Sequence, residues 1–151
     1  MASLSGKYAQ LDSIDIDLTT GRLRLKIDGA CPALKKIETD VTTGRLEMDL
    51  TGRFDVLKTL DLESTTGTMN VDLSGEWKTN ADVRIRTTTG RIRVKLPKDA
   101  GVRVDADTTT GKIKTDDLTL SDDFLVNSAY GKSPVTLELK IRTTTGAIDV
   151  K

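Results

Sequence analysis

Residues 83–96 read Val-Arg-Ile-Arg-Thr-Thr-Thr-Gly-Arg-Ile-Arg-Val-Lys-Leu, and this segment contains the unit on which the whole chain is built. On both sides of Thr-Thr-Thr-Gly, apolar residues alternate with charged ones. A period of two is typical of a β-strand with one buried face. Glycine adopts positive φ at little steric cost, so the tetrapeptide suits a bend. The segment therefore predicts a strand, a turn and a second strand.

The tripeptide Thr-Thr-Gly occurs six times in the 151 residues, and its glycines are spaced by 23, 23, 23, 21 and 35 positions. A constant period of this length is typical of stacked repeat architectures. We therefore expect an all-β, single-stranded parallel β-helix or β-solenoid of about six rungs. Its structural turn residues are Thr20, Gly21, Thr43, Gly44, Thr66, Gly67, Thr89, Gly90, Thr110, Gly111, Thr145 and Gly146.

The alternation of apolar residues changes parity at each turn. In the first repeat the apolar positions before the turn are even-numbered, from Ile14 to Leu18, and those after it are odd-numbered, from Leu23 to Ile27. A turn or bulge that absorbs one residue produces such a slip. Extending the even series predicts that Thr20 and its equivalents point inward.

Two topologies fit this slip. In a β-arc, the two strands face each other across a core and each pairs with the next rung, whereas in a hairpin they pair with each other as an antiparallel meander or sandwich. We favour the solenoid with rungs in sequence order, because near-identical turns let like residues stack. The outward pairs before turns four to six alternate in sign, which supports that order: Arg84 and Arg86, Asp105 and Asp107, Lys140 and Arg142.

The repeat defines the expected domain organisation. Residues 1–10 precede the first repeat and are interpreted as an N-terminal cap, while residues 11–151 form the repeat domain. The last glycine interval is longer than the others, which predicts an inserted loop at about 116–134. The chain stops within an ordinary post-turn strand, residues 147–151, so this strand is expected to offer an open edge for end-to-end association.

The segment 83–97 and the following Ala-Gly-Val-Arg-Val-Asp-Ala of residues 100–106 resemble the adhesin-like "toastrack" domains of bacteria and archaea. This family has no assigned function and is related to LiaF- and LiaG-type envelope-stress proteins. The resemblance covers about residues 11–151. It implies a right-handed β-helix, no catalytic residues, and a location at the cell envelope or outside the cell. The near-uniform Thr-Thr-Gly departs from the looser Ser/Thr-Gly turns usual in that family.

Composition argues against several function classes. The chain has no histidine, a single cysteine (Cys31), and 23 basic against 23 acidic residues. A balanced charge provides no general attraction for nucleic acid, and histidine is the commonest general base and metal ligand. No signal peptide and no apolar stretch of membrane-spanning length is present in these 151 residues. We expect a non-enzymatic structural or interaction module without cofactor or metal, with a self-assembling filament scaffold as an alternative.

One column of cations suggests a ligand. Arg22, Arg45, Arg91 and Lys112 each follow a turn glycine directly, and together they form a possible polyanion strip. Such a strip could bind an anionic polysaccharide through charge. The alternative is a solvated face whose long side chains cover the sheet. No aromatic residue interleaves with the strip, so stacking on sugars or bases lacks support.

Three further patterns have simpler explanations than a binding site. The stacked threonines could form an ice-binding face, but adjacent threonines at a turn are better explained as turn formers. Acidic pairs before the first three turns could bind calcium, and are equally expected of a solvated strip. Asp116-Asp117 and Asp122-Asp123 are interpreted as loop residues, and Cys31 as a structural or incidental thiol.

Overall fold

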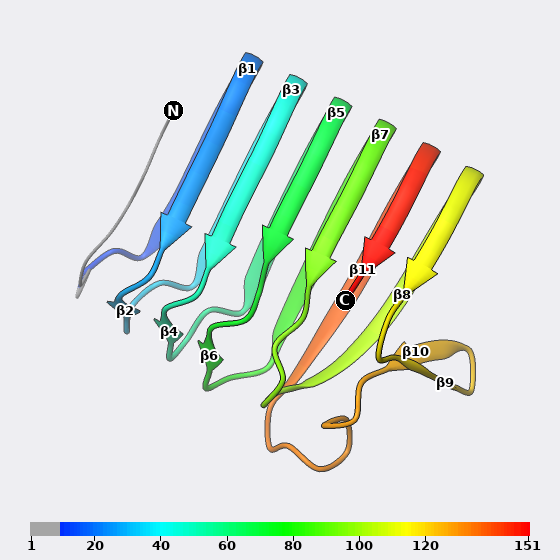
Figure 1. Ribbon diagram of the computed structural model, residues 1–151. Helices are drawn as coiled ribbons and strands as arrows, with labels where there is room; N and C mark the ends of the chain where they lie inside the picture. Colours follow the sequence, from blue (N-terminus) through cyan, green and yellow to red (C-terminus); the bar gives the residue numbers. More distant parts are fainter. Residues whose placement is uncertain (1–9) are drawn as a thin grey trace.

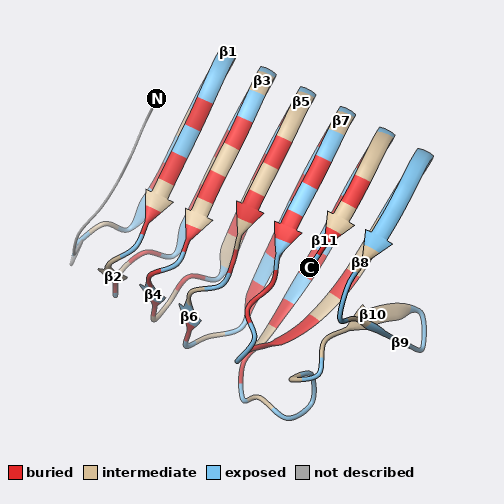
Figure 2. Cartoon of the chain, in the orientation of Figure 1, coloured by how far each residue is buried: buried red, intermediate tan, exposed pale blue. Residues whose placement is uncertain are grey.

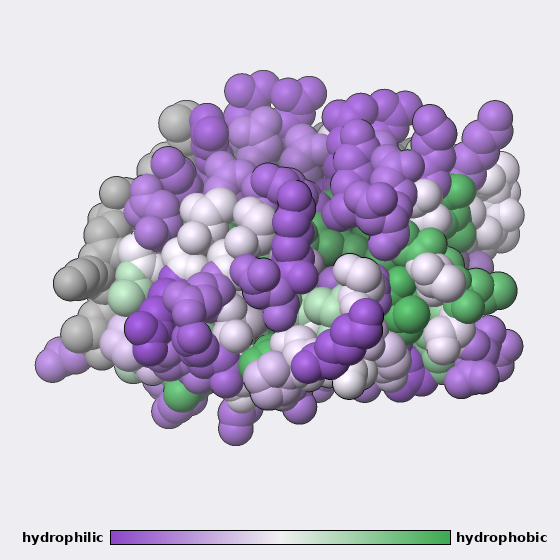
Figure 3. Space-filling model, turned by 60° about the horizontal axis from the view of Figure 1, so that its bottom comes forward, coloured by the Kyte–Doolittle hydropathy of each residue, from purple (hydrophilic) through white to green (hydrophobic). Residues whose placement is uncertain are grey.

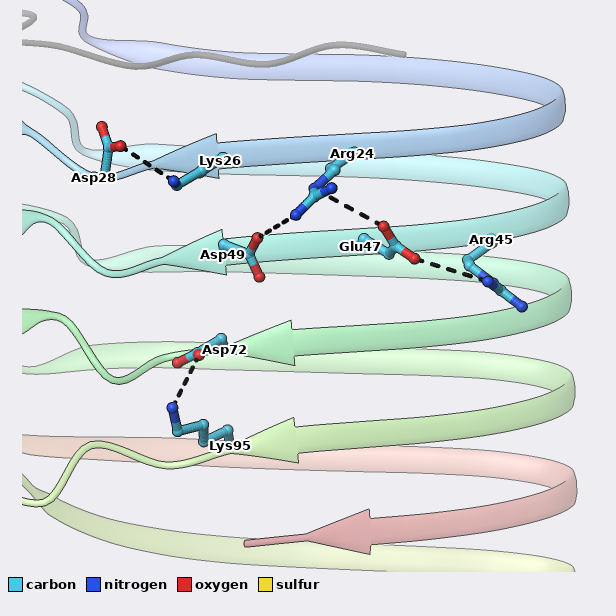
Figure 4. A network of polar contacts seen from close by, with 8 residues as sticks. All are labelled: Arg24, Lys26, Asp28, Arg45, Glu47, Asp49, Asp72 and Lys95. Carbon is cyan, nitrogen blue, oxygen red and sulfur yellow. Dashed lines mark hydrogen bonds and ion pairs between the residues drawn. The ribbon is translucent and has the colours of Figure 1, made fainter.

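The computed structural model describes residues 10–151, and its framework is six long strands. They are β1 (Ser13–Ile27), β3 (Lys36–Leu50), β5 (Thr59–Asp72), β7 (Ala81–Lys95), β8 (Gly101–Thr115) and β11 (Thr136–Val150). Each bends at its Thr-Thr-Gly into two arms, here called the pre-turn arm and the post-turn arm. The bend gives every rung the shape of a U (Figure 4).

The long strands pair in parallel, turn upon turn. Thr20 lies opposite Thr43 and Gly21 opposite Gly44, and the same register continues from β3 through β5 to β7. No long strand pairs with itself across its turn in the described residues. The expectation of a parallel β-solenoid is therefore confirmed, and the antiparallel meander is wrong for these strands.

The expected stacking in sequence order fails at the last two rungs. The order in space is β1-β3-β5-β7-β11-β8, so the last strand of the chain lies between β7 and β8 (Figure 1). Ile148 of β11 is paired with Ile92 of β7 on one side and with Ile113 of β8 on the other. The alternation of charge sign in the sequence seemed to support stacking in sequence order. That interpretation was wrong, because the basic pre-turn arms of β7 and β11 are adjacent in the structure.

The internal position of β11 and the terminal position of β8 follow from how well the inward side chains of each rung can be buried. The inward positions of β11 are Leu137, Leu139, Ile141, Ile148 and Val150, all buried. The corresponding positions of β8 include Ala106, Thr108 and Thr115, which are only partly buried, and Ile113, which is 39% exposed. A rung with small or polar inward residues loses least free energy at the end of the stack, where one side faces solvent.

The C-terminal residues therefore do not form the open edge that the sequence suggested. The end rung is β8, and part of its outer edge is covered by the hairpin of β9 (Thr119–Ser121) and β10 (Phe124–Val126). β10 runs antiparallel to β8, with Leu125 opposite Val104. The post-turn arm of β8 has no strand beyond it among the described residues.

One side chain fastens this insertion to the stack. The Asn127 side-chain oxygen accepts a hydrogen bond from the Val102 backbone N–H at 2.9 Å, and its amide nitrogen donates to the carbonyls of Ala100 at 2.9 Å and Pro97 at 3.3 Å. Asn127 thereby joins the inserted segment to the linker between β7 and β8. That linker passes from β7 to β8, and β11 occupies the position in the sheet between these two strands.

A short three-stranded sheet closes the open side of the first rungs. It consists of β2 (Ala30–Cys31), β4 (Arg53–Phe54) and β6 (Glu76–Trp77), paired in parallel. Cys31, Phe54 and Trp77 share one inward column, and the rings of Phe54 and Trp77 lie 5.1 Å apart between centroids. The Trp77 indole N–H donates to the Leu73 carbonyl at 2.9 Å.

The core lies between the two arms and is almost entirely aliphatic. Buried and exposed positions alternate along the strands, which gives the banded pattern of Figure 2. Leu25, Met48 and Val71 form one of the stacked columns, exposed by 0%, 0% and 3%. Narrow aliphatic layers explain why a chain with few aromatic residues can form a core of this kind.

The turn glycines have the backbone conformation that the sequence predicted, with φ between 130° and 159° at all six. This is a region that side-chain-bearing residues rarely occupy. A Cβ added to Gly90 would lie 1.7 Å from the Gly67 carbonyl oxygen, whereas one added to Gly21 in the first rung meets no atom within 4 Å. The turns are thus close-packed against one another as well as tightly bent.

Thr20 and its equivalents do not point inward as the parity argument predicted. Both threonines of each Thr-Thr-Gly are exposed, and the inward series ends at the residue before them, as at Ser64 and Thr87. The bend spans several residues, so both threonine side chains lie on its convex side. The predicted change of parity is correct, but it is spread over the whole bend and is not confined to one residue.

Two further expectations concern the N-terminal residues and membrane-spanning segments. The N-terminal cap predicted for residues 1–10 lies, apart from residue 10, outside the described residues. Within residues 10–151 there is no helix of the length and apolarity needed to cross a membrane.

Candidate functional site

The predicted cation column lies along the stack on the outside of the post-turn arms. Arg22 of β1 and Arg45 of β3 are direct neighbours, and the positions in β5 and β11 are filled by Thr68 and Ala147. Because β11 separates β7 from β8, Ala147 stands between Arg91 and Lys112. The structure therefore brings the four residues into one column, in which only Arg22 and Arg45 occupy adjacent rungs.

In the first rungs the cations of this face are engaged with carboxylates (Figure 4). Arg24 lies 3.6 Å from Asp49 and 4.0 Å from Glu47, and Arg45 lies 3.9 Å from the same Glu47. Lys26 pairs with Asp28 at 3.4 Å. Arg24, Lys26 and Arg45 thus have much of their charge balanced within the protein, whereas Arg22 has no carboxylate oxygen within 4.0 Å in the described residues.

In the last rungs the cations are not engaged in this way. Within the described part of the chain, Arg91 and Arg93 of β7 and Lys112 and Lys114 of β8 have no carboxylate oxygen within 4.0 Å. The acid nearest in register is Asp149 of β11, which stands between Arg93 and Lys114. Four cations therefore surround one carboxylate at this end of the face.

The alternation of long and small side chains leaves a shallow hollow of about 730 Å³, here called the basic hollow. Its cationic rim is Arg45, Arg91, Arg93 and Lys112. Thr68, Asn70, Ala147 and three turn glycines form the rest of its lining: Gly90, Gly111 and Gly146. Among residues 10–151, no acidic residue lines it.

A second hollow of about 450 Å³ adjoins it and has mixed charge, including Asp49, Asp72, Lys95 and Asp149. Here burial raises the pKa of the Asp72 carboxyl, but hydrogen bonds from Ser74 and Lys95 outweigh this effect and leave the pKa below its ordinary value. Lys95 Nζ lies 3.3 Å from Asp72 Oδ2, so the pair links β5 to β7. This hollow is internally compensated, unlike the basic hollow.

The pre-turn face has the opposite character. A depression of about 220 Å³ over β1, β3 and β5 is lined by six carboxylates, those of Asp15, Asp17, Glu38, Asp40, Asp61 and Glu63. In residues 10–151 no group of three or more Asp, Glu or Cys side chains is arranged to hold a metal ion. Further along, Arg142 of β11 binds Asp105 at 2.8 Å and Asp107 at 2.9 Å.

Other residues singled out in the sequence have structural settings. Asp122 and Asp123 form the tip of the β9–β10 hairpin, with Asp122 at a φ of 54°. Cys31 is fully buried, and this burial raises the pKa of its thiol. The paired threonine columns lie exposed at the turns, in register from rung to rung.

Sequence reasoning placed Arg93 and Lys114 at one repeat position of the basic face but did not identify Asp149 as their neighbour. The missing information was the position of β11, since Asp149 lies beside Arg93 only if β11 follows β7. A usable signal existed, because residues 101–115 have the poorest set of inward apolar residues and are therefore suited to the end of the stack.

An apolar surface is present at the β8 end as well. Leu120 is 70% exposed, Ile113 39% and Tyr130 38%. In Figure 3 apolar atoms gather at the side of the molecule where Figure 1 has β8 to β10, while the rest of that view is mainly hydrophilic. Ile113 belongs to the end rung, Leu120 to its hairpin, and Tyr130 to the segment between β10 and β11.

Comparison with known proteins supports the architecture. No protein-family model matches the chain, and no curated protein matches it either. A crystal structure from Clostridium sporogenes, described as a "putative cell adhesion protein", matches with a TM-score of 0.77. It is 21% identical, and the match covers 93% of each chain. At this identity the likeness shows a common fold over nearly the whole length.

Proposed function

We propose that this chain is a non-catalytic, adhesin-like interaction module that acts at the cell envelope as a rigid support for exposed side chains. The observation that carries the proposal is the stack itself. Six parallel rungs in register repeat each outward position along one axis and so create extended columns of like side chains. Solenoids of this type present extended binding surfaces.

Two features of the described residues support an interaction role over catalysis. The hollows are open surface depressions lined by charged and small side chains, and catalytic sites are usually concave pockets with convergent polar groups. The pKa shifts of the charged side chains arise from ion pairs and hydrogen bonds at the surface. The Clostridium sporogenes structure, described as a "putative cell adhesion protein", supports this role.

The filament alternative is less favoured by the charges at the two ends. If β1 of a second copy stacked on β8 in the turn register, Asp15 and Asp17 would face Asp105 and Asp107. On the other arm, Arg22 and Arg24 would face Lys112 and Lys114. Like charges directly opposite each other destabilise strand pairing, so head-to-tail association in register is opposed on both arms.

The proposal can be tested by measuring the adhesion of beads to which the domain is coupled. Beads that carry the folded domain at defined density should be retained under flow on isolated cell-wall material or extracellular-matrix coatings. Beads with the heat-unfolded domain, or with an unrelated protein of equal charge, should detach. Equal detachment of all three kinds of bead on every surface would contradict an adhesive function.

A further inference from the structure

We propose that the basic hollow binds a linear anionic glycan, and that the polymer lies along the stack of rungs, from β3 across β5, β7 and β11 to β8. This inference rests on the proposed function, because it assigns a ligand class to the adhesive module. It also relocates the polyanion strip, since it places the binding surface at the β7–β11–β8 end and not along the whole column from Arg22.

The spacing of the rim supports a polymer with regularly repeated charges. Neighbouring strands are about 4.8 Å apart, so side chains two rungs apart are separated by about 9.6 Å. Arg45 and Arg91 are two rungs apart across Thr68, and Arg91 and Lys112 are two rungs apart across Ala147. Cations at this interval, with depressions between them, match anionic groups that recur at about the same distance.

The charges at this end are available for a ligand. Arg24 and Arg45 would have to share carboxylates that they already contact, but Arg91, Arg93 and Lys112 have none within 4.0 Å in the described residues. A single exposed ion pair contributes little free energy. The free energies of several ion pairs on one rigid surface add up, because the β-sheet holds the cations in place before the ligand binds.

The neutral part of the lining favours a glycan over nucleic acid. No aromatic side chain lines the hollow, and binding of single-stranded nucleic acid depends strongly on stacking against aromatic rings. Thr68 contributes a hydroxyl and Asn70 a side-chain amide to the lining. Sugar hydroxyls can donate to and accept from such groups.

Binding should be measured with fluorescent oligosaccharides at low salt, by anisotropy, with a sulfated probe (a heparin fragment) and a carboxylate-only probe (oligogalacturonate). Neutral dextran should not bind. The double variant Arg91→Gln/Lys112→Gln should bind either charged probe at least about tenfold more weakly and should show a shallower dependence on salt. Asp149→Asn removes the carboxylate that lies between Arg93 and Lys114 and should tighten binding about threefold.

A matched control makes the same change of charge on the opposite face of the same end of the stack. Arg84→Gln/Lys140→Gln removes one arginine and one lysine from β7 and β11 on the pre-turn face, and should leave affinity within about twofold. The proposal is overturned if neither charged probe binds the parent protein, if the control loses affinity as much as the double variant, or if single-stranded DNA of equal charge binds more tightly. Should these tests fail while the coated beads still adhere, the adhesive function stands and another surface is responsible.

Discussion

The first four rungs and the last two solve the same stacking problem in different ways. From β1 to β7 the chain advances by 23 residues a turn and each rung lies on its predecessor. After β7 the chain skips one position, forms β8, and returns through a long segment to place β11 in the gap. The comparison teaches that a repeated turn specifies how a rung bends and in which register it stacks, but not which rung is its neighbour.

The reason is that the six turns are interchangeable. Thr145 and Gly146 are in register with Thr89 and Gly90 on one side and with Thr110 and Gly111 on the other. Any rung would find the same register on any other. The order is decided by the lengths of the connections and by how much apolar surface each rung exposes at the end of the stack.

Replacing turn glycines should give the largest effects and would separate bending from stacking. Gly90→Ala combines the unfavourable positive φ with a Cβ that would lie 1.7 Å from the Gly67 carbonyl oxygen, so we expect a loss of about 3 kcal/mol or more. Gly21→Ala has the strain alone and should lose about 1–2 kcal/mol. Urea unfolding measures both, and equal losses would contradict close stacking of the turns.

The second prediction compares the internal rung with the end rung. Ile148→Ala in β11 should cost about 2–5 kcal/mol, because its side chain is 1% exposed. Ile113→Ala occupies the same repeat position in β8 and should cost less than about 1 kcal/mol, because its side chain is 39% exposed. If the rungs were stacked in sequence order, the larger loss would be found at Ile113.

The third prediction concerns the fastening of the irregular end. Asn127→Ala removes three hydrogen bonds to the β7–β8 linker and the start of β8 and should cost about 1–3 kcal/mol. The exposed neighbour Ser128→Ala is the matched control and should be neutral. Limited proteolysis should cut the Asn127 variant faster within residues 96–101. Equal resistance of the two variants would mean that the insertion is held by other contacts.

The smallest effect is a pH dependence within the regular rungs. The pKa of Asp72 is lowered in the folded protein, so its contribution to stability is present above its unfolded pKa and is lost as pH falls through the folded value. The pair is partly exposed, so the contribution should be under about 1 kcal/mol. Melting temperatures from pH 6 to pH 2 should fall less steeply for Asp72→Asn than for the parent. Parallel curves would show that the carboxyl is not stabilised.

Much of the rung could be predicted from the sequence, because a strict period of two and an obligatory glycine leave few local alternatives. The parallel register and the positive φ at Gly21 and its equivalents follow from this local chemistry. The orientation of Thr20 was wrong because parity was extended into the bend. The position of β11 and the β9–β10 hairpin depend on competition between whole rungs, and the basic hollow depends on the position of β11.

The central claim is that β11 lies between β7 and β8, and cysteine cross-linking tests it most directly. In a Cys31→Ala background, Arg91→Cys with Ala147→Cys joins neighbouring strands about 4.8 Å apart, within the range for a disulfide. Arg91→Cys with Lys112→Cys joins strands about 9.6 Å apart, beyond that range. The account predicts an intramolecular disulfide, under mild oxidation of the folded protein, in the first variant and not in the second. A disulfide in the second variant and none in the first would establish stacking in sequence order and contradict the account.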